Sequence, residues 1–362
     1  KNESVRAREI APNSLIFYWP GEGGEEGVWS CAQQMDKIAY KEFDFLLVWG
    51  NEQKNQFKKI YRNTEKIFVC GNPRLDTLKY GKKYLKKINK KKSVGIVGKY
   101  TFLNHNQGIP TALKIAKSDH LFKNVLRQSF AFRTIIELID EIVRKTDYMV
   151  SVRPYISEGL KVYEDIIRRK KWEDRVFVDS SVMFADWVMK QNVLITESSS
   201  TFLEAYIAKV PTINLDKIIR RNSKGLAYDW EDQPDYQYFQ TALESFLSSN
   251  SPNTYQELIK MLVKKIKPVK KNKLIEKHLN ELHNWNFPQA STNLASEIIK
   301  TEVLKSKFFN NFYVPKVFLE LVDMISFSRA EKINPEHSSF HYYKKIHKIP
   351  EFYHDIVSEM LK

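Results

Sequence analysis

Short apolar runs alternate with longer amphipathic stretches in the first part of the chain. The apolar runs predict buried strands at residues 14–19, 45–49 and 67–70, and the stretches around 30–42 and 51–61 between them predict helices. Strands separated by helices are typical of βαβ units in a parallel sheet. We therefore expect a first parallel α/β unit near the N-terminus.

A second alternation of the same kind begins after a lysine-rich stretch. The predicted strands are residues 93–97, 148–152, 175–178, 193–196 and 211–215, and the predicted helices are 130–145, 162–171, 182–189 and 201–208. Five strands with crossover helices indicate a doubly wound sheet, whose ligands bind beyond the carboxyl ends of the strands. From about residue 235 the pattern is helical. The predicted fold is α/β, with two Rossmann-like domains, an interdomain cleft and a helical C-terminal tail.

These patterns give the following domain boundaries. We expect an incomplete N-terminal Rossmann-like domain over residues 1–80, a lysine-rich linker over 81–92, a second Rossmann-like domain over 93–235 and a helical region over 236–362. The chain has no initiator methionine and reaches its first predicted strand at Ser14. We therefore expect that an N-terminal segment is missing from this sequence.

Composition narrows the class of protein. Hydrophobic residues make up 43% and aromatic residues 13% of the chain, which indicates a globular protein. No stretch has the roughly 20 apolar residues that a membrane-spanning helix needs. Two cysteines, Cys31 and Cys70, show no metal or redox spacing and predict reduced thiols in a cytosolic protein.

The excess of 58 Lys and Arg over 43 Asp and Glu, a net charge of +15, favours anionic partners such as phosphates or an anionic membrane.

A cluster of hydroxyl side chains follows the predicted strand at 193–196. Its members are Ser198, Ser199, Ser200 and Thr201. They stand where a helix begins, and a helix N-terminus offers free N–H groups and the positive end of its dipole to an anion. The structural alternative is a Thr201-x-x-Glu204 capping box. Because one cap needs one hydroxyl, four of them favour a phosphate site.

Arg153 lies at the end of another predicted strand, directly before Pro154. The same edge of the sheet carries the hydroxyl cluster, so Arg153 could make a fork contact with a phosphate. A surface arginine before a turn fits this segment equally well.

An acidic turn with several glycines follows the first predicted strand, in the sequence WPGEGGEEG at 19–27. Glu22, Glu25 and Glu26 are crowded there, and crowded carboxylates raise one another's pKa, as a general base needs. On these residues alone a flexible acidic loop is the better interpretation. His337 and His341 are spaced as a metal pair on a helix would be, but no further ligands complete a set, so we predict no metal site.

Four segments together resemble a known family. They are VWG at 48–50, VCGNPRLD at 69–76, SVRPYISE at 151–158 and LITESSSTFLEAYIAKVPTINL at 194–215. In order and spacing, over about residues 15–220, they resemble the bacterial surface carbohydrate biosynthesis proteins, which are GT-B-like and related to capsule and lipopolysaccharide transferases. The chain is also similar to bacterial sialyl- and Kdo-type transferases, which use CMP-linked sugars. Those enzymes carry an acidic motif that supplies the base, an HP motif that contacts the nucleotide and a hydroxyl pair that holds its phosphate.

The resemblance assigns roles to individual residues. Glu25-Glu26-Gly27 matches the acidic motif with Glu25 as the base, and Ser199 and Ser200 match the hydroxyl pair. The usual Arg-Pro-His-Pro is Arg-Pro-Tyr-Ile here, so Tyr155 stands where the histidine is expected. A phenol with a pKa of about 10 cannot replace imidazole as a proton donor near neutral pH, but it can hydrogen-bond or stack. Glu204 becomes a candidate for holding the ribose hydroxyls.

The implied function is transfer of a nonulosonate or Kdo-type sugar from a CMP-linked donor to a surface-polysaccharide acceptor, which is a glycan or a lipid-linked glycan. The implied enzyme is a glycosyltransferase that needs neither a metal nor a cofactor, because donors and a helix end stabilise the leaving phosphate. It would lie in the bacterial cytoplasm, peripheral to the inner membrane face. The alternatives are a CDP-polyol phosphotransferase of the teichoic acid type and a catalytically inactive GT-B scaffold or glycan-binding protein. We expect no nucleic-acid partner, because the basic runs lack a recognisable binding module.

Overall fold

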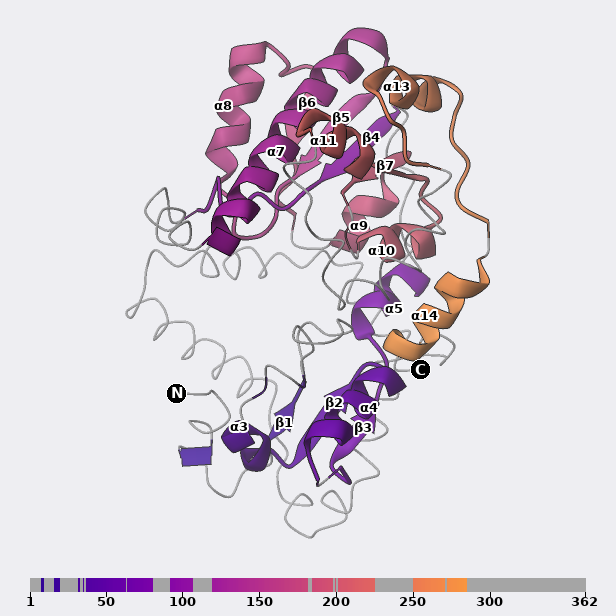
Figure 1. Ribbon diagram of the computed structural model, residues 1–362. Helices are drawn as coiled ribbons and strands as arrows, with labels where there is room; N and C mark the ends of the chain where they lie inside the picture. The colour runs from indigo at the N-terminus through magenta and orange to yellow at the C-terminus, as the bar shows by residue number, and fades with distance from the viewer. Residues whose placement is uncertain are drawn as a thin grey trace, which may run out of the picture.

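The structure of the chain is a computed structural model. It describes residues 8–9, 16–19, 32, 35, 37–62, 64–80, 92–106, 119–181, 184–197, 199, 201–224, 250–270 and 272–284. Two separate parallel sheets organise these residues (Figure 1).

The first sheet has three parallel strands in the order β1-β2-β3. The elements of this unit are β1 (Phe17–Tyr18), α3 (Lys37–Glu42), β2 (Phe45–Val48), α4 (Asn51–Ile60) and β3 (Ile67–Val69). Aromatic and aliphatic side chains from both helices and from β2 make its core, including Tyr40, Phe43 and Phe57. The sequence VWG at 48–50 closes β2, and α4 begins directly after Gly50.

The second sheet has five parallel strands in the order β6-β5-β4-β7-β8. The strands are β4 (Ser93–Val97), β5 (Met149–Arg153), β6 (Val176–Val178), β7 (Val193–Thr196) and β8 (Thr212–Asn214). The connecting helices are α7 (Asp119–Lys145), α8 (Leu160–Lys170), α9 (Phe184–Met189), α10 (Thr201–Ala208) and α11 (Asp216–Asn222), and α13 (Tyr255–Val263) follows later in the chain. From β4 the chain continues to β5 and β6 on one side of the sheet, and β7 and β8 lie on the other side, as in doubly wound folds.

Alternating side chains of the second sheet build two cores, one on each face. Val94 and Ile96 of β4 pack with α7, α8, α11 and α13, whereas Val97 packs on the opposite face with α9 and α10. Such an alternation follows from the period of two along a strand. Because both faces are covered, the strands read as continuous apolar runs in the sequence.

Two further helices lie between the sheets (Figure 1). In α5 (Pro73–Tyr80), Leu75 and Leu78 join the core that α9 and α10 form on the second sheet. In α14 (Lys273–His283), Ile275 and Leu279 join the same core. The residues that end α14 meet the first unit instead. A Cβ on Gly50 would lie 2.2 Å from the carbonyl oxygen of Glu281, so only glycine fits there.

The prediction of an α/β protein with two parallel sheets is confirmed, consistent with a GT-B-like fold. All eight predicted strands are present to within a few residues, and α10 has its predicted bounds. The predicted helix at 130–145 begins earlier, at Asp119. The helical C-terminal tail is seen as α13 and α14, and residues 285–362 lie outside the described part. The interdomain cleft, the domain boundaries and the 81–92 linker stay predictions. No helix in the described ranges has the length and apolar character needed to cross a membrane.

Candidate functional site

The order of strands in the second sheet defines where a ligand would bind. Chain connections leave β4 toward β5 on one side, while β7 lies on the other side of β4. In such sheets the crevice opens beyond the carboxyl ends of the two central strands, at this switch point. Here those strands are β4, followed by Gly98-Lys99-Tyr100, and β7, followed by Glu197 and the hydroxyl cluster.

A buried hydrogen-bonded group joins the two sides of the switch point. The Tyr100 hydroxyl donates to Glu197 Oε1 at 2.8 Å, and Arg127 Nη1 from α7 contacts Glu197 Oε2 at 2.9 Å. Burial raises the pKa of Glu197, and Arg127 opposes this by stabilising the charged carboxylate. Gly98 makes room for the arrangement, because a Cβ there would lie 2.1 Å from the Tyr100 hydroxyl oxygen. The group fixes the ends of β4 and β7 relative to each other.

A second buried carboxylate, Glu158, ties the loop after β4 to the loop after β5. Its Oε1 accepts the backbone N–H of Tyr100 at 2.9 Å and that of Tyr155 at 3.1 Å, and its Oε2 accepts the Tyr163 hydroxyl. Burial raises its pKa to about 6, although these three donors favour the charged form. The Gly159 backbone N–H also donates to the Asn104 carbonyl at 2.9 Å, and the Asn104 side-chain amide donates to the Gly159 carbonyl at 2.7 Å, which joins the two loops. Glu158 therefore fixes the loops after β4 and β5 relative to each other.

Arg153, the predicted phosphate ligand, ends β5 on the expected edge of the sheet. Its Nη1 contacts Asp179 Oδ1 at 3.0 Å and Ser181 Oγ at 2.9 Å, both in the segment after β6. The guanidinium also lies 5.6 Å from the ring centres of Phe184 and Trp187. Only 13% of the side chain is exposed. These contacts hold Arg153 rigidly within the protein, and its contact with a phosphate stays a prediction.

Tyr155, which stands at the expected histidine position, lies half-buried beside the end of β4. The ammonium of Lys99 lies 4.7 Å from the centre of its ring, a cation–π contact between the segments that follow β4 and β5. Lys99 itself is exposed. The pair places a positive charge and an aromatic face at the switch point, where they could contact a phosphate and a base or sugar ring.

The hydroxyl cluster is described at two of its four predicted positions, Ser199 and Thr201. Ser199 Oγ accepts from the Thr201 backbone N–H at 3.4 Å and from Thr201 Oγ1 at 3.2 Å, and Thr201 Oγ1 lies 3.5 Å from Thr196 Oγ1. Thr201 is the first residue of α10 and Ser199 is the partner of its N–H, so the Thr201–Glu204 capping box suggested by the sequence stays a prediction. The hydroxyls lie at the N-terminus of α10, as the phosphate hypothesis requires. Ser198 and Ser200 lie outside the described residues.

Glu204, in the first turn of α10, is a half-buried carboxyl beside two arginines. Burial raises its pKa to about 7, and the charges of Arg74 and Arg153 oppose that rise. Arg74 belongs to α5, which packs against α10, and its exposed guanidinium makes no hydrogen bond or ion pair within the described part of the chain. Arg74 also lowers the pKa of His283 at the end of α14, which burial brings to about 3. The charges of Arg74 from α5 and Arg153 from β5 therefore both act on Glu204 in α10.

The three carboxylates of the acidic turn, Glu22, Glu25 and Glu26, lie outside the described residues, and so do His337 and His341. Their predicted roles stay predictions. In the ranges that the structure describes, no three His, Cys, Asp or Glu side chains gather as a metal site requires. The one predicted thiol that is described, Cys70, is buried and free.

Several residues of this site were missed by sequence reasoning. Arg74 belongs to the GNPR sequence at 71–74, which gave only a weak indication of a site because nothing in the sequence shows that α5 packs on α10. Lys99 and Tyr100 follow a strand whose central place in the sheet only the fold reveals. Glu197 could have been found from the sequence, because it is a carboxylate that lies between a buried strand and the hydroxyl cluster. A carboxylate at that boundary must find partners, and here they are Tyr100 and Arg127.

Comparison with known proteins gives distant structural similarity only. No protein-family model matches the sequence, and no curated protein matches it. A variant of the wall teichoic acid polymerase TagF has a TM-score of 0.46 and 15% identity over 82% of this chain and 70% of that one. The S. aureus MnaA–UDP structure scores 0.45 with 12% identity over 84% of this chain and 79% of that one. A putative UDP-N-acetylglucosamine 2-epimerase from Listeria monocytogenes scores 0.44 with 12% identity over 83% and 71%.

The chain spans less than two thirds of some of these relatives, with 58% coverage for one TagF structure and 59% for another. All of these scores are below 0.5 and all identities are below 25%. Their activities and substrates are therefore not transferred to this protein.

Proposed function

We propose that this protein is a GT-B-type glycosyltransferase that binds a nucleotide-activated donor at the carboxyl edge of the five-stranded sheet, between β4 and β7. The observation that carries the proposal is the packing of α5 on α10 beside the switch point of the sheet, through which the charge of Arg74 acts on Glu204 near the N-terminus of α10. A cation without an ion-pair partner among the described residues, a helix N-terminus and hydroxyl donors suit a phosphate. A carboxyl group suits the ribose hydroxyls.

Each group has a distinct part in the proposed reaction. Arg74, Lys99 and the α10 N-terminus stabilise the negative charge that develops on the leaving phosphate. Ser199 and Thr201 donate neutral hydrogen bonds to the same oxygens once they exchange their bonds to each other. Glu204 accepts the ribose hydroxyls, and the charged form that this needs is stabilised by the two arginines. The base is Glu25 of the acidic turn, and no metal is required.

The acceptor is a surface-polysaccharide glycan, free or lipid-linked, and the donor is CMP-linked in this proposal. Both assignments extend the resemblance of the motifs to surface carbohydrate transferases. The competing reaction, transfer of a polyol phosphate from a CDP-linked donor, would use the same phosphate site. The two reactions differ in the bond that breaks. A glycosyltransferase with a CMP-linked donor breaks the bond between the sugar carbon and the phosphate oxygen, so the phosphate leaves with CMP. A phosphotransferase with a CDP-linked donor breaks the P–O–P bond, which also releases CMP but adds a polyol phosphate to the product.

Nucleotide binding tests the site first. Thermal unfolding is followed with CMP, CDP, UDP and GDP, and a ligand at about 100 times its dissociation constant should add about 2.7 kcal/mol to the free energy of unfolding. The Arg74→Gln variant should lose most of this stabilisation. Arg62→Gln, which removes an exposed arginine of the first unit, should keep it.

Product mass then tests the reaction. Incubation with CMP-sugar and CDP-polyol donors distinguishes addition of a sugar from addition of a polyol phosphate. Equal stabilisation of wild type and Arg74→Gln by every nucleotide would refute the site. If the product gains the mass of a polyol phosphate, the proposed phosphate site stands but the reaction is that of a phosphotransferase and not of a glycosyltransferase.

A further inference from the structure

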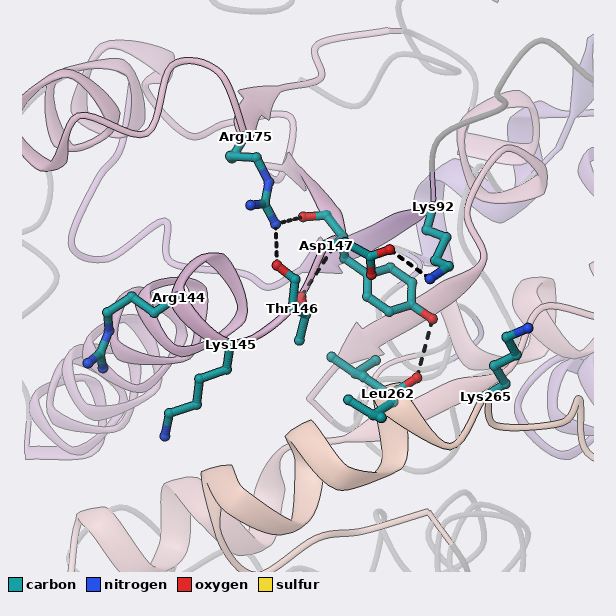
Figure 2. Close-up of a pocket in the computed structure, with 10 residues that line it drawn as sticks. Lys92, Arg144, Lys145, Thr146, Asp147, Arg175, Leu262 and Lys265 are labelled. Atoms are coloured by element: carbon teal, nitrogen blue, oxygen red, sulfur yellow. Dashed lines mark hydrogen bonds and ion pairs between the residues drawn. The ribbon is translucent and has the colours of Figure 1, made fainter.

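A cavity of about 490 Å³ opens at the other edge of the second sheet, at the amino ends of β4 and β5 (Figure 2). Four segments line it: the start of β4, the turn from α7 to β5, the residue before β6, and the end of α13. Strands of a parallel sheet have their carboxyl ends at the opposite edge, so this cavity is separate from the crevice at the switch point. The proposed transferase site does not use it.

Positive charge dominates the lining. It holds five cations, Lys92, Arg144, Lys145, Arg175 and Lys265, and a single carboxylate, Asp147. Lys92 pairs with Asp147 at 2.7 Å, while Arg144 and Lys145 pair with acidic residues of their own helix, such as Glu141. Within the described residues, Arg175 and Lys265 make no ion pair. The cavity therefore carries a positive charge that its own carboxylate does not balance.

The arginine is held in a fixed position. Arg175 Nη2 donates to the carbonyl oxygens of Thr146 at 2.7 Å and Tyr148 at 2.8 Å, as Figure 2 shows. The structure gives Nη1 and Nε no partner among the described residues. A guanidinium that is already oriented loses little further freedom when it binds an oxyanion through its remaining N–H groups.

The opposite wall of the cavity is fixed as well. The Tyr148 hydroxyl donates to the carbonyl of Leu262 at 3.3 Å, which joins the start of β5 to the end of α13. Lys265 follows in a left-handed conformation, with φ of 55°, and is one of the residues that line the cavity. Cations near helix carboxyl ends offset the helix dipole, which explains part of the charge at α7 and α13. Lys92 and Arg175 precede strands, so the dipoles do not explain them.

The surface around the cavity continues the same charge. Lys264 is exposed directly after α13, and Val263 next to it is 65% exposed. Such a surface would draw an anion toward the cavity at physiological salt only from within about 8 Å, the Debye length.

We propose that this cavity is a second anion site, which binds a phosphate group through Arg175 and Lys265, and through Lys145 once it exchanges its ion pair with Glu141 for the phosphate. Planar guanidinium and mobile ammonium groups are the two side-chain types that bind phosphate oxygens in proteins. The phosphate belongs either to a soluble phosphate compound or to the headgroup of a membrane lipid. Both sources present the same chemistry to the three cations.

The test removes two cations and keeps Arg175, because Arg175 also supports the turn before β5. Lys145→Gln with Lys265→Gln is compared with Lys58→Gln with Lys217→Gln, two exposed lysines on other parts of the surface. Each pair lowers the net charge equally. Binding of inorganic pyrophosphate is measured by calorimetry, and binding to phosphatidylglycerol and phosphatidylcholine vesicles by sedimentation.

For one of the two anionic probes, the affinity of the Lys145→Gln, Lys265→Gln protein should fall at least about fivefold. The affinity of the Lys58→Gln, Lys217→Gln control for the same probe should fall less than twofold. Pyrophosphate as that probe indicates a soluble ligand, and phosphatidylglycerol indicates a lipid. Equal loss in both variants would show a general charge effect and overturn the proposal, as would a loss in neither. Arg74→Gln is measured alongside, because pyrophosphate binding that disappears there and persists in the cavity variant would assign the ligand to the transferase site alone.

Discussion

The pair of Arg127 and Glu197 provides the sharpest test of the structure at the switch point. The Arg127→Met variant keeps side-chain length and helix propensity but removes the charge. It leaves Glu197 with one hydrogen bond, from Tyr100, and no cation. Because the Glu197 side chain is only 8% exposed and that of Arg127 is 20% exposed, an unpaired carboxylate would remain largely buried.

The magnitude follows from that burial. Removing one partner of a buried ion pair costs about 3–5 kcal/mol, and the partial exposure of Arg127 points to the lower end, about 3 kcal/mol. With a urea slope of about 3 kcal/mol/M, the unfolding midpoint should fall by about 1 M. The matched control is Arg133→Met on the same helix, since Arg133 pairs with Glu137 at the surface with 76% of its side chain exposed. That midpoint should stay within error, because exposed pairs contribute little.

The pH dependence gives an independent check. Loss of Arg127 raises the pKa of Glu197 further, and a carboxyl whose folded pKa exceeds its unfolded value destabilises the protein only while it is charged. Lowering the pH from 7 to 5 should therefore reduce the difference between wild type and Arg127→Met. The assay is urea unfolding followed by tryptophan fluorescence at both pH values. Equal effects of the two arginine substitutions, or a difference that does not change with pH, would refute a buried charge at Glu197.

Three further predictions concern other parts of the molecule. Gly98→Ala should lower the free energy of unfolding by about 1–3 kcal/mol in a urea titration, since its Cβ would displace Tyr100, whereas Gly159→Ala, with its nearest atom at 3.0 Å, should cost less. Burial lowers the pKa of His283 to about 3, so its contribution to the free energy of unfolding is complete above the unfolded pKa near 6.5 and is lost as the pH falls. Between pH 7 and 5 the wild type should therefore lose about 2 kcal/mol of stability relative to His283→Gln. Parallel pH profiles of the two proteins would contradict this. Glu25→Gln should reduce the rate of sugar transfer by about 10²–10⁴-fold with nucleotide affinity unchanged, and a rate within a few-fold of wild type would place the base elsewhere.

Much of the fold was readable from the sequence because local patterns determine it. Strands buried on both faces must be apolar throughout, and the segments at 93–97 and 193–196 show this directly. The helix at 201–208 follows its hydroxyl cluster without a break, so even its bounds could be predicted. The edge that would carry the ligand also follows from sequence, since parallel strands present all their carboxyl ends on one side.

What the sequence left open depends on contacts between distant segments. Strand order places β4 beside β7, and this juxtaposition alone brings Tyr100 to Glu197. The charge of Arg74 acts on Glu204 because α5 packs on α10 instead of on its own sheet. No local pattern encodes these pairings, since each depends on the packing of whole helices and strands. The sequence determined which elements form and at which edge the carboxyl ends of the strands gather, and tertiary packing decided which charges meet there.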